Sequence, residues 1–130
     1  MKRSISEAVI AHKQGKFEEA EKLYLSILKN EPKNLIVRNN LGALLINLGR
    51  LDEAEINYKK LISIKPDNAE ACNNLGVTLD KLNKLNEAEE IYRKAIEINP
   101  NYPEAFNNLG LTLRKLGRLT ESEASYREAI

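Results

Sequence analysis

The chain repeats itself with a period of 34 residues. The letters Asn-Asn-Leu-Gly recur unchanged at residues 39–42, 73–76 and 107–110. Three further series keep the same period: Pro32, Pro66 and Pro100; Ala20, Ala54 and Ala88; Tyr24, Tyr58, Tyr92 and Tyr126. Such agreement indicates internal duplication, so the fold must be built by stacking copies of one small unit. The copies span residues 1–34, 35–68, 69–102 and 103–130, and the last of them is incomplete.

Each copy predicts two helices joined by a tight turn. Leu41, Leu45 and Leu48 have the i, i+4, i+7 spacing of a buried helix face. The fifteenth position of each copy carries residues that tolerate a left-handed backbone: Gly15, Gly49, Asn83 and Gly117. The second helices are expected to begin near Phe17, Leu51, Leu85 and Leu119, and Asn34, Asn68 and Asn101 are available to cap the first helices that follow. No segment has a strand pattern, so the predicted fold class is all-α.

Small residues predict a close crossing of the two helices within a copy. Glycine at the eighth position, as in Gly42, is matched by alanine or serine at the twentieth, as in Ala54 and Ser122. The tyrosine at the twenty-fourth position, as in Tyr58, lies on the apolar seam of the second helix. We therefore expect the tyrosines to pack between copies and not to stack on nucleic-acid bases.

These residues resemble the pattern of the tetratricopeptide repeat. The Leu-Gly, Ala, aromatic, aliphatic and Pro positions of that pattern are occupied in the second copy by Leu41, Gly42, Ala54, Tyr58, Leu61 and Pro66. The resemblance implies an α-solenoid, in which helix-turn-helix repeats stack as a right-handed superhelix with a concave groove. The length of 130 residues predicts a single domain over residues 1–130. A repeat scaffold of this kind accepts many ligands, so the resemblance is specific for fold and weak for function.

Composition and charge exclude several classes of partner. Lys and Arg total 20 and Asp and Glu total 19, so the net charge of +1 offers no field that would attract nucleic acid or a membrane surface. One cysteine and one histidine cannot supply a disulfide or a Cys/His metal site. No apolar run has the length of a signal peptide or a membrane span. We expect a soluble, cytoplasmic protein without metal or cofactor.

The sequence contains no motif that predicts catalysis. Nucleophilic catalysis needs a nucleophile beside a base, and His12 is expected to be an isolated, exposed helical residue. Cys72 is expected to be a partly buried structural thiol. Glu87, Glu89 and Glu90 are interpreted as a solvated helix face that recurs because the repeat recurs. The prediction is therefore a protein that is not an enzyme.

The asparagine pairs are the candidate binding residues. The sixth position lies about 130° around the first helix from the leucine stripe, so Asn should face away from the core. A carboxamide both donates and accepts, which suits a peptide backbone of any sequence. First helices about 8 to 10 Å apart would place one Asn at about every third residue of an extended peptide. The candidates are Asn40, Asn74 and Asn108, with Asn39, Asn73 and Asn107 beside them.

Charged residues are expected along both edges of this groove. Lys81 and Lys115 recur at the thirteenth position, and Glu70 and Glu104 at the second. The groove charges of the last three copies balance, so we expect a ligand of mixed charge that binds with weak salt dependence.

An Asn at the sixth position resembles the superhelical lining of the O-linked N-acetylglucosamine transferases and related bacterial repeat proteins. That resemblance implies that the groove holds polypeptide backbone. The alternative is that the duplicated ancestor carried Asn-Asn by chance and that the pair has no role. The predicted function is an adaptor, or the recruiting arm of a larger protein, that binds an extended polypeptide. A part of a multidomain, glycosyltransferase-like enzyme and a self-assembly scaffold are the alternatives.

The two ends of the chain carry separate expectations. Glu7 and Gln14 give the first copy a polar outward face, and Ser4 and Glu7 have the spacing of a capping box. The fourth copy stops at Ile130, inside its second helix, which suggests a fragment of a longer array. Its last helix is expected to expose an apolar patch that a homodimer through the C-terminal end would cover; the patch residues are Leu119, Tyr126 and Ala129.

Overall fold

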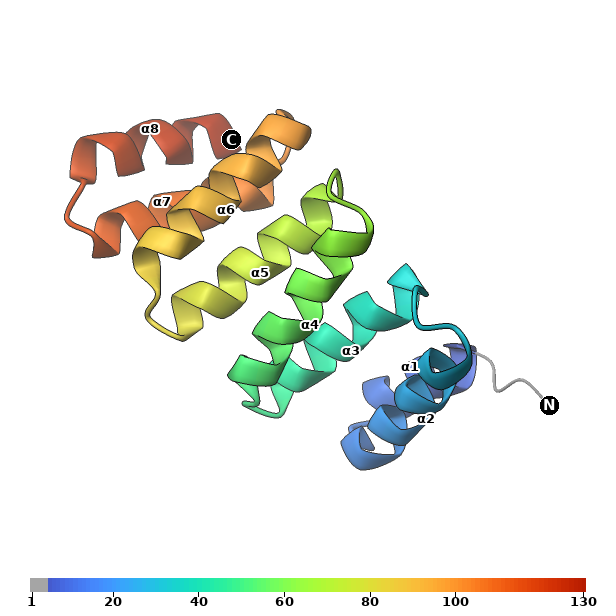
Figure 1. Ribbon diagram of the computed structural model, residues 1–130. Coiled ribbons are helices and arrows are strands. Elements are labelled where there is room, and N and C mark those ends of the chain that lie inside the picture. The colour runs from blue at the N-terminus through green and yellow to red at the C-terminus, as the bar shows by residue number, and fades with distance from the viewer. Residues whose placement is uncertain (1–4) are drawn as a thin grey trace. The chain divides into compact units, whose positions relative to one another are not determined.

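The computed structural model describes residues 5–130, and this range contains eight α-helices and no strand (Figure 1). The predicted all-α class is confirmed. The chain divides into two compact units, with the boundary between Ile64 and Lys65, and each is described separately. Unit 1 holds α1 (Ile5–Lys13), α2 (Phe17–Asn30), α3 (Leu35–Asn47) and α4 (Leu51–Ile64). Unit 2 holds α5 (Ala69–Lys81), α6 (Leu85–Ile98), α7 (Pro103–Lys115) and α8 (Leu119–Ala129). That all four repeats form one domain stays a prediction.

Each repeat folds as a helical hairpin, and the helix limits follow the repeat. All four second helices begin at the expected residues. The fifteenth position has a positive φ in every repeat, with 74° at Gly49 and 62° at Asn83. Asn83 is the only residue other than glycine with a positive φ among residues 5–130, and asparagine is the side chain that best tolerates it. The capping box predicted at Ser4 falls outside the described residues.

The first helices begin in two different ways. The side chains of Asn34 and Asn68 accept hydrogen bonds from the backbone N–H of Val37 and Ala71, at 3.1 and 3.0 Å, as expected of N-caps. The cap predicted at Asn101 is wrong. Pro103 occupies the first turn of α7, so Tyr102 becomes the N-cap and Asn101 lies one residue too early.

A glycine–tyrosine contact holds the two helices of a hairpin together. A Cβ atom added to Gly110 would lie 2.7 Å from Cε1 of Tyr126, and Gly42 and Gly76 meet Tyr58 and Tyr92 in the same way. Each ring lies against the glycine of its own repeat, a contact within the hairpin that was not predicted from the sequence. That the tyrosines also pack between repeats stays a prediction. The twentieth position joins the same crossing, since the Ser122 hydroxyl donates to the Gly110 carbonyl oxygen at 2.7 Å.

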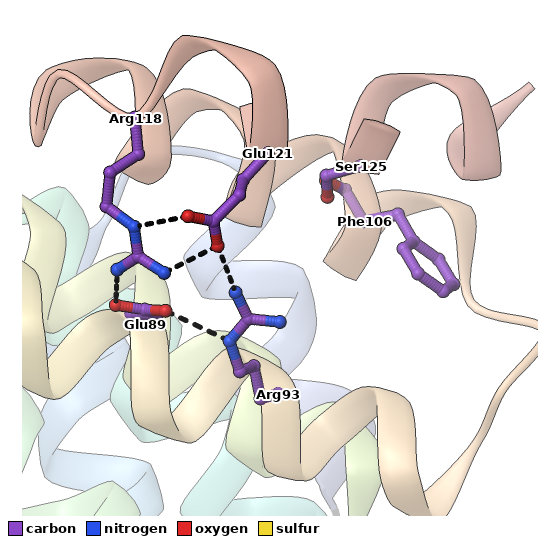
Figure 2. Close-up of polar contacts among 6 residues, drawn as sticks. All are labelled: Glu89, Arg93, Phe106, Arg118, Glu121 and Ser125. Carbon is purple, nitrogen blue, oxygen red and sulfur yellow. Dashed lines mark hydrogen bonds and ion pairs between the residues drawn. The ribbon is translucent and has the colours of Figure 1, made fainter. Parts of the chain in front are cut away.

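An arginine held by two carboxylates joins the repeats within each unit. In unit 1, Arg50 bonds to Glu21 at 2.8 Å and to Glu53 at 2.5 Å. In unit 2, Arg118 bonds to Glu89 at 2.5 Å and to Glu121 at 2.6 Å (Figure 2). In each unit the arginine thereby links the second helices of two successive repeats, α2 to α4 and α6 to α8.

Glu89 does not belong to a solvated helix face, which corrects the interpretation from sequence. Its side chain is only 14% exposed and also accepts from Nε of Arg93 at 3.0 Å. Burial alone would raise the pKa of this carboxyl, but the hydrogen bonds from Arg118 and Arg93 outweigh it and the pKa is lowered. The residue faces two cations because Arg118, at the N-cap of α8, reaches it from the next repeat, while Arg93 lies one turn along α6.

We predict that Gly76→Ala destabilises unit 2 although alanine is the better helix former. Overpacking against the buried ring of Tyr92 should cost about 1–3 kcal/mol, offset by at most about 1 kcal/mol of helix propensity. Chemical denaturation of the single variants and of the double variant Gly76→Ala, Tyr92→Leu measures the coupling. Tyr92→Leu should cost less in the alanine background than in the native one. Equal costs in the two backgrounds would show that the contact carries no strain.

Candidate functional site

The sixth position of the last three repeats is half-exposed, next to a buried leucine. Asn40 on α3, Asn74 on α5 and Asn108 on α7 all keep part of their side chains accessible. The leucine that follows each of them is 6% exposed or less. This burial pattern fits a leucine stripe that faces the hairpin core and an asparagine that does not. That the three asparagines form one row stays a prediction.

The fifth position has a different environment in each repeat. Asn73 is 7% exposed, and its Oδ1 accepts a hydrogen bond from Nδ2 of Asn108 at 3.1 Å. Asn107 is exposed on α7, where it lines a surface hollow with Tyr126 and Ala129. Asn39 is half-buried. Neighbouring helix positions point about 100° apart, so the two asparagines of a pair point in different directions. In unit 2, Asn73 connects α5 to α7.

The two candidate lysines also differ. Lys81 is exposed, whereas Nζ of Lys115 is paired with a carboxylate oxygen of Asp80. The other oxygen of Asp80 accepts from the hydroxyl of Thr112 at 2.6 Å. The Asp80 side chain is only 12% exposed. The charge of Lys115 is thus compensated by its own unit, and a ligand would meet a neutral pair at this point.

Tyr102 is a site residue that the sequence reasoning missed. It is half-buried at the start of α7, close enough to Asn73, Glu70 and Glu104 for all three to affect its ionisation. Burial raises the pKa of its phenol most, the two carboxylates raise it further, and the hydrogen bond with Asn73 opposes them. The sequence could have indicated it, because Tyr102 is an exception at the last position of the repeat, where the two preceding repeats have Asn. Tyr102 adds an aromatic ring with a hydroxyl to this surface.

His12 has partners in two other helices, which corrects the expectation of an isolated, exposed residue. Its Nδ1 lies 3.2 Å from the hydroxyl of Tyr24 on α2, and its Nε2 lies 2.9 Å from Nδ2 of Asn47 on α3. The ring also meets Phe17 edge to face, with centroids 5.9 Å apart. The imidazole therefore fills a structural position between three helices of unit 1.

The described residues offer little for other chemistry. Among residues 5–130 no three His, Cys, Asp or Glu side chains are grouped so that they could hold a metal ion. Cys72 is a buried free thiol, as expected, and burial raises its pKa, which disfavours the reactive thiolate. No helix in this range combines the length and apolar character needed to cross a membrane.

Comparison with known protein families finds matches along the repeats. Models of the tetratricopeptide repeat match residues 6–69, 69–102 and 91–124, which together cover most of the chain. The chain belongs to the tetratricopeptide repeat family. This confirms the family resemblance and the repeat period, and tetratricopeptide repeats make the chain a scaffold of the protein-interaction type. No curated protein sequence matches it.

Solved structures with the same fold include several of MamA. One, a crystal structure of MamA protein, is 25% identical to this tetratricopeptide repeat protein, with a TM-score of 0.87 over 95% of this chain and 67% of that chain. Another, MamA 41-end from Desulfovibrio magneticus RS-1, is 18% identical, with a TM-score of 0.88 over 96% and 71%. These likenesses support the stacked-hairpin fold. The finer resemblance to the transferase arrays stays a prediction.

We predict that His12 makes unit 1 less stable in mild acid. Partial burial lowers the pKa of His12, so the unfolded chain binds the proton more tightly than the folded chain. The neutral ring makes its full contribution to the free energy of unfolding above pH 6.5, the ordinary pKa of histidine. This contribution is lost as the pH falls from 6.5 toward the lower pKa of His12 in the folded chain. Urea denaturation at pH 7, 6 and 5 should show a falling free energy of unfolding for the native chain.

The matched variant is His12→Gln, which keeps hydrogen-bonding capacity without a titratable group. Its free energy of unfolding should fall less over the same range. Parallel curves for the two proteins would assign the acid sensitivity to other groups.

Proposed function

We propose that this protein is a non-catalytic interaction module that binds an extended polypeptide along the first helices of its repeats, as an adaptor or a recruiting arm. The observation that carries the proposal is the half-exposure of Asn40, Asn74 and Asn108, each on a first helix and beside a buried leucine. Asparagine is a mediocre helix former, so its recurrence inside helices favours a role for the side chain.

The contacts in unit 2 support backbone recognition. The hydrogen bond from Nδ2 of Asn108 to Asn73 fixes the orientation of the Asn108 amide before any ligand arrives. A fixed amide loses little conformational freedom on binding, which favours affinity. The same surface carries Tyr102 with two carboxylates near it, the exposed Lys81 and the neutral Asp80–Lys115 pair, so charges of both signs are present and neither sign dominates. A peptide would therefore be bound mainly through hydrogen bonds, with weak dependence on salt.

We predict that changing Asn40, Asn74 and Asn108 together to alanine weakens peptide binding more than it weakens folding. Each lost hydrogen bond should cost about 0.5–1.5 kcal/mol of binding free energy. The probe is a fluorescein-labelled pool of unstructured twelve-residue peptides, measured by fluorescence anisotropy against the native chain and the variant. Thermal melting of both proteins reports the effect on folding. Equal anisotropy curves for native and variant chains would remove the proposal.

A matched control changes three exposed asparagines elsewhere to alanine: Asn30, Asn86 and Asn101. This control should bind the pool like the native chain. A second arm replaces the amide at every third residue of the peptide with an ester, which removes an N–H donor but keeps the side chains. The native chain should lose affinity for the ester series, and the triple asparagine variant should lose less, because its partner amides are already absent.

Self-association through α8 is the second candidate, because Leu119 is 60% exposed. The structure modifies the patch predicted there. The ring of Tyr126 lies against Gly110 inside its own hairpin, and Ala129 is half-buried. Sedimentation over a wide concentration range, for the native chain and for Leu119→Lys, tests this candidate. A monomer at all concentrations would remove it, whatever the peptide assay shows.

A further inference from the structure

Unit 1 carries an open groove on the side of its second helices. The groove has a volume of about 540 Å³ and lies between α2 and α4. Leu41 and Leu45 of α3 line it, together with two aliphatic side chains that are exposed to solvent, Leu25 at 49% and Ile56 at 70%. Asn40, Asn74 and Asn108 are not part of it, so this surface is separate from the one proposed to bind peptide backbone.

The equivalent groove in unit 2 is partly closed by one side chain. It is about 280 Å³ and lies between α6 and α8, with Leu109 and Leu113 in the places of Leu41 and Leu45. Arg93 crosses it and bonds to Glu89 at 3.0 Å and to Glu121 at 3.4 Å (Figure 2). Leu25 occupies the position of Arg93 in unit 1 and cannot form such a bridge.

Leu25 is an exception within its own repeat position. The other three repeats have a lysine or an arginine there. Each of these basic side chains forms an ion pair with the glutamate four residues earlier: Lys59 with Glu55, Arg93 with Glu89 and Arg127 with Glu123. In the first repeat the glutamate, Glu21, bonds instead to Arg50. The first repeat thus has an exposed leucine where the other repeats have a basic residue in an ion pair, and the larger groove of unit 1 lacks the side chain that crosses the groove of unit 2.

Two cations line the same groove without a carboxylate partner. The Nε of Arg38 donates to the carbonyl oxygen of Pro32 at 2.8 Å, and its Nη1 donates to Oδ1 of Asn57 at 3.4 Å, so both acceptors are neutral. Lys60 is exposed. Within residues 5–130 neither Arg38 nor Lys60 takes part in an ion pair. The anions of the groove, Glu21 and Glu53, are both held by Arg50.

We propose that this groove binds a segment of a partner protein in which aliphatic side chains lie next to carboxylates. The aliphatic side chains would cover Leu25, Leu41 and Ile56, and the carboxylates would pair with Arg38 and Lys60. A guanidinium already oriented by neutral acceptors is well suited to a carboxylate, and an apolar floor with a charged rim is the usual anatomy of a peptide site. This interaction goes beyond the proposed function, because the groove would recognise the side chains of the bound segment and not its backbone.

The test uses the full chain, labelled for NMR, and three acetylated and amidated pentapeptides. The first is Ser-Leu-Leu-Glu-Asp, the second replaces its acids to give Ser-Leu-Leu-Gln-Asn, and the third replaces its leucines to give Ser-Ser-Ser-Glu-Asp. The first peptide should shift the methyl signals of Leu25, Leu41 and Ile56. The other two should bind at least about fivefold more weakly, as expected when one significant contact is lost.

The decisive variant is Leu25→Arg, which copies the residue found in unit 2. It should weaken binding of the acidic peptide about tenfold by filling the groove. Long-range attraction cannot explain that result, because the new positive charge would by itself strengthen binding of an acidic peptide. The control is Ile36→Arg, which places the same charge on another exposed aliphatic residue of unit 1 and should not weaken binding.

Lys60→Glu is a second variant, needed if Leu25→Arg folds poorly. It copies Glu128, the equivalent residue in unit 2, and should weaken binding of the acidic peptide but not of its Gln-Asn analogue. The proposal is overturned if the methyl signals do not shift, if the three peptides bind alike, or if neither variant affects binding. It is also overturned if those signals shift with protein concentration alone, since the occupant would then be a second copy of the chain.

Discussion

The contact between a glycine on the first helix and a tyrosine on the second sets the geometry of every hairpin after the first. Because Gly42, Gly76 and Gly110 lack a Cβ, the rings of Tyr58, Tyr92 and Tyr126 approach the first-helix backbone directly. That approach fixes how closely the paired helices pack. The leucine stripe, the half-exposed asparagines and the outer faces of the second helices all take their positions from it.

Contacts between repeats differ from one unit to the other, whereas the glycine–tyrosine contact inside each hairpin after the first stays the same. Directly before the second helices α4 and α8, Arg50 and Arg118 each bind two carboxylates. On the first helices, the twelfth position of one repeat meets the thirteenth of the next. In unit 1 this is a neutral pair, His12 with Asn47, and in unit 2 it is the ion pair of Asp80 with Lys115. Equivalent positions therefore form a hydrogen bond in one unit and an ion pair in the other.

Most of the fold could be predicted from the sequence because it depends on contacts within one repeat. The helix limits and the left-handed turn at Asn83 follow from comparing equal positions of the four copies. The partners of His12 and Asn73 were missed because they join unequal positions. Both contacts link residues 35 apart, one more than the repeat length. A comparison of the sequence with itself at that offset would have suggested them, but the choice of partner still depends on how far each side chain reaches.

The hairpin contact also has a consequence for how such a chain can change over generations. Glycine and tyrosine of one contact belong to the same copy, so gain or loss of genetic material in whole repeats never separates them. A gain or loss of any other length between the glycine and the tyrosine of a contact would change their spacing and separate them. Duplication in steps of one repeat is thus the route by which this architecture can lengthen or shorten and still fold, while each new copy remains free to acquire its own surface.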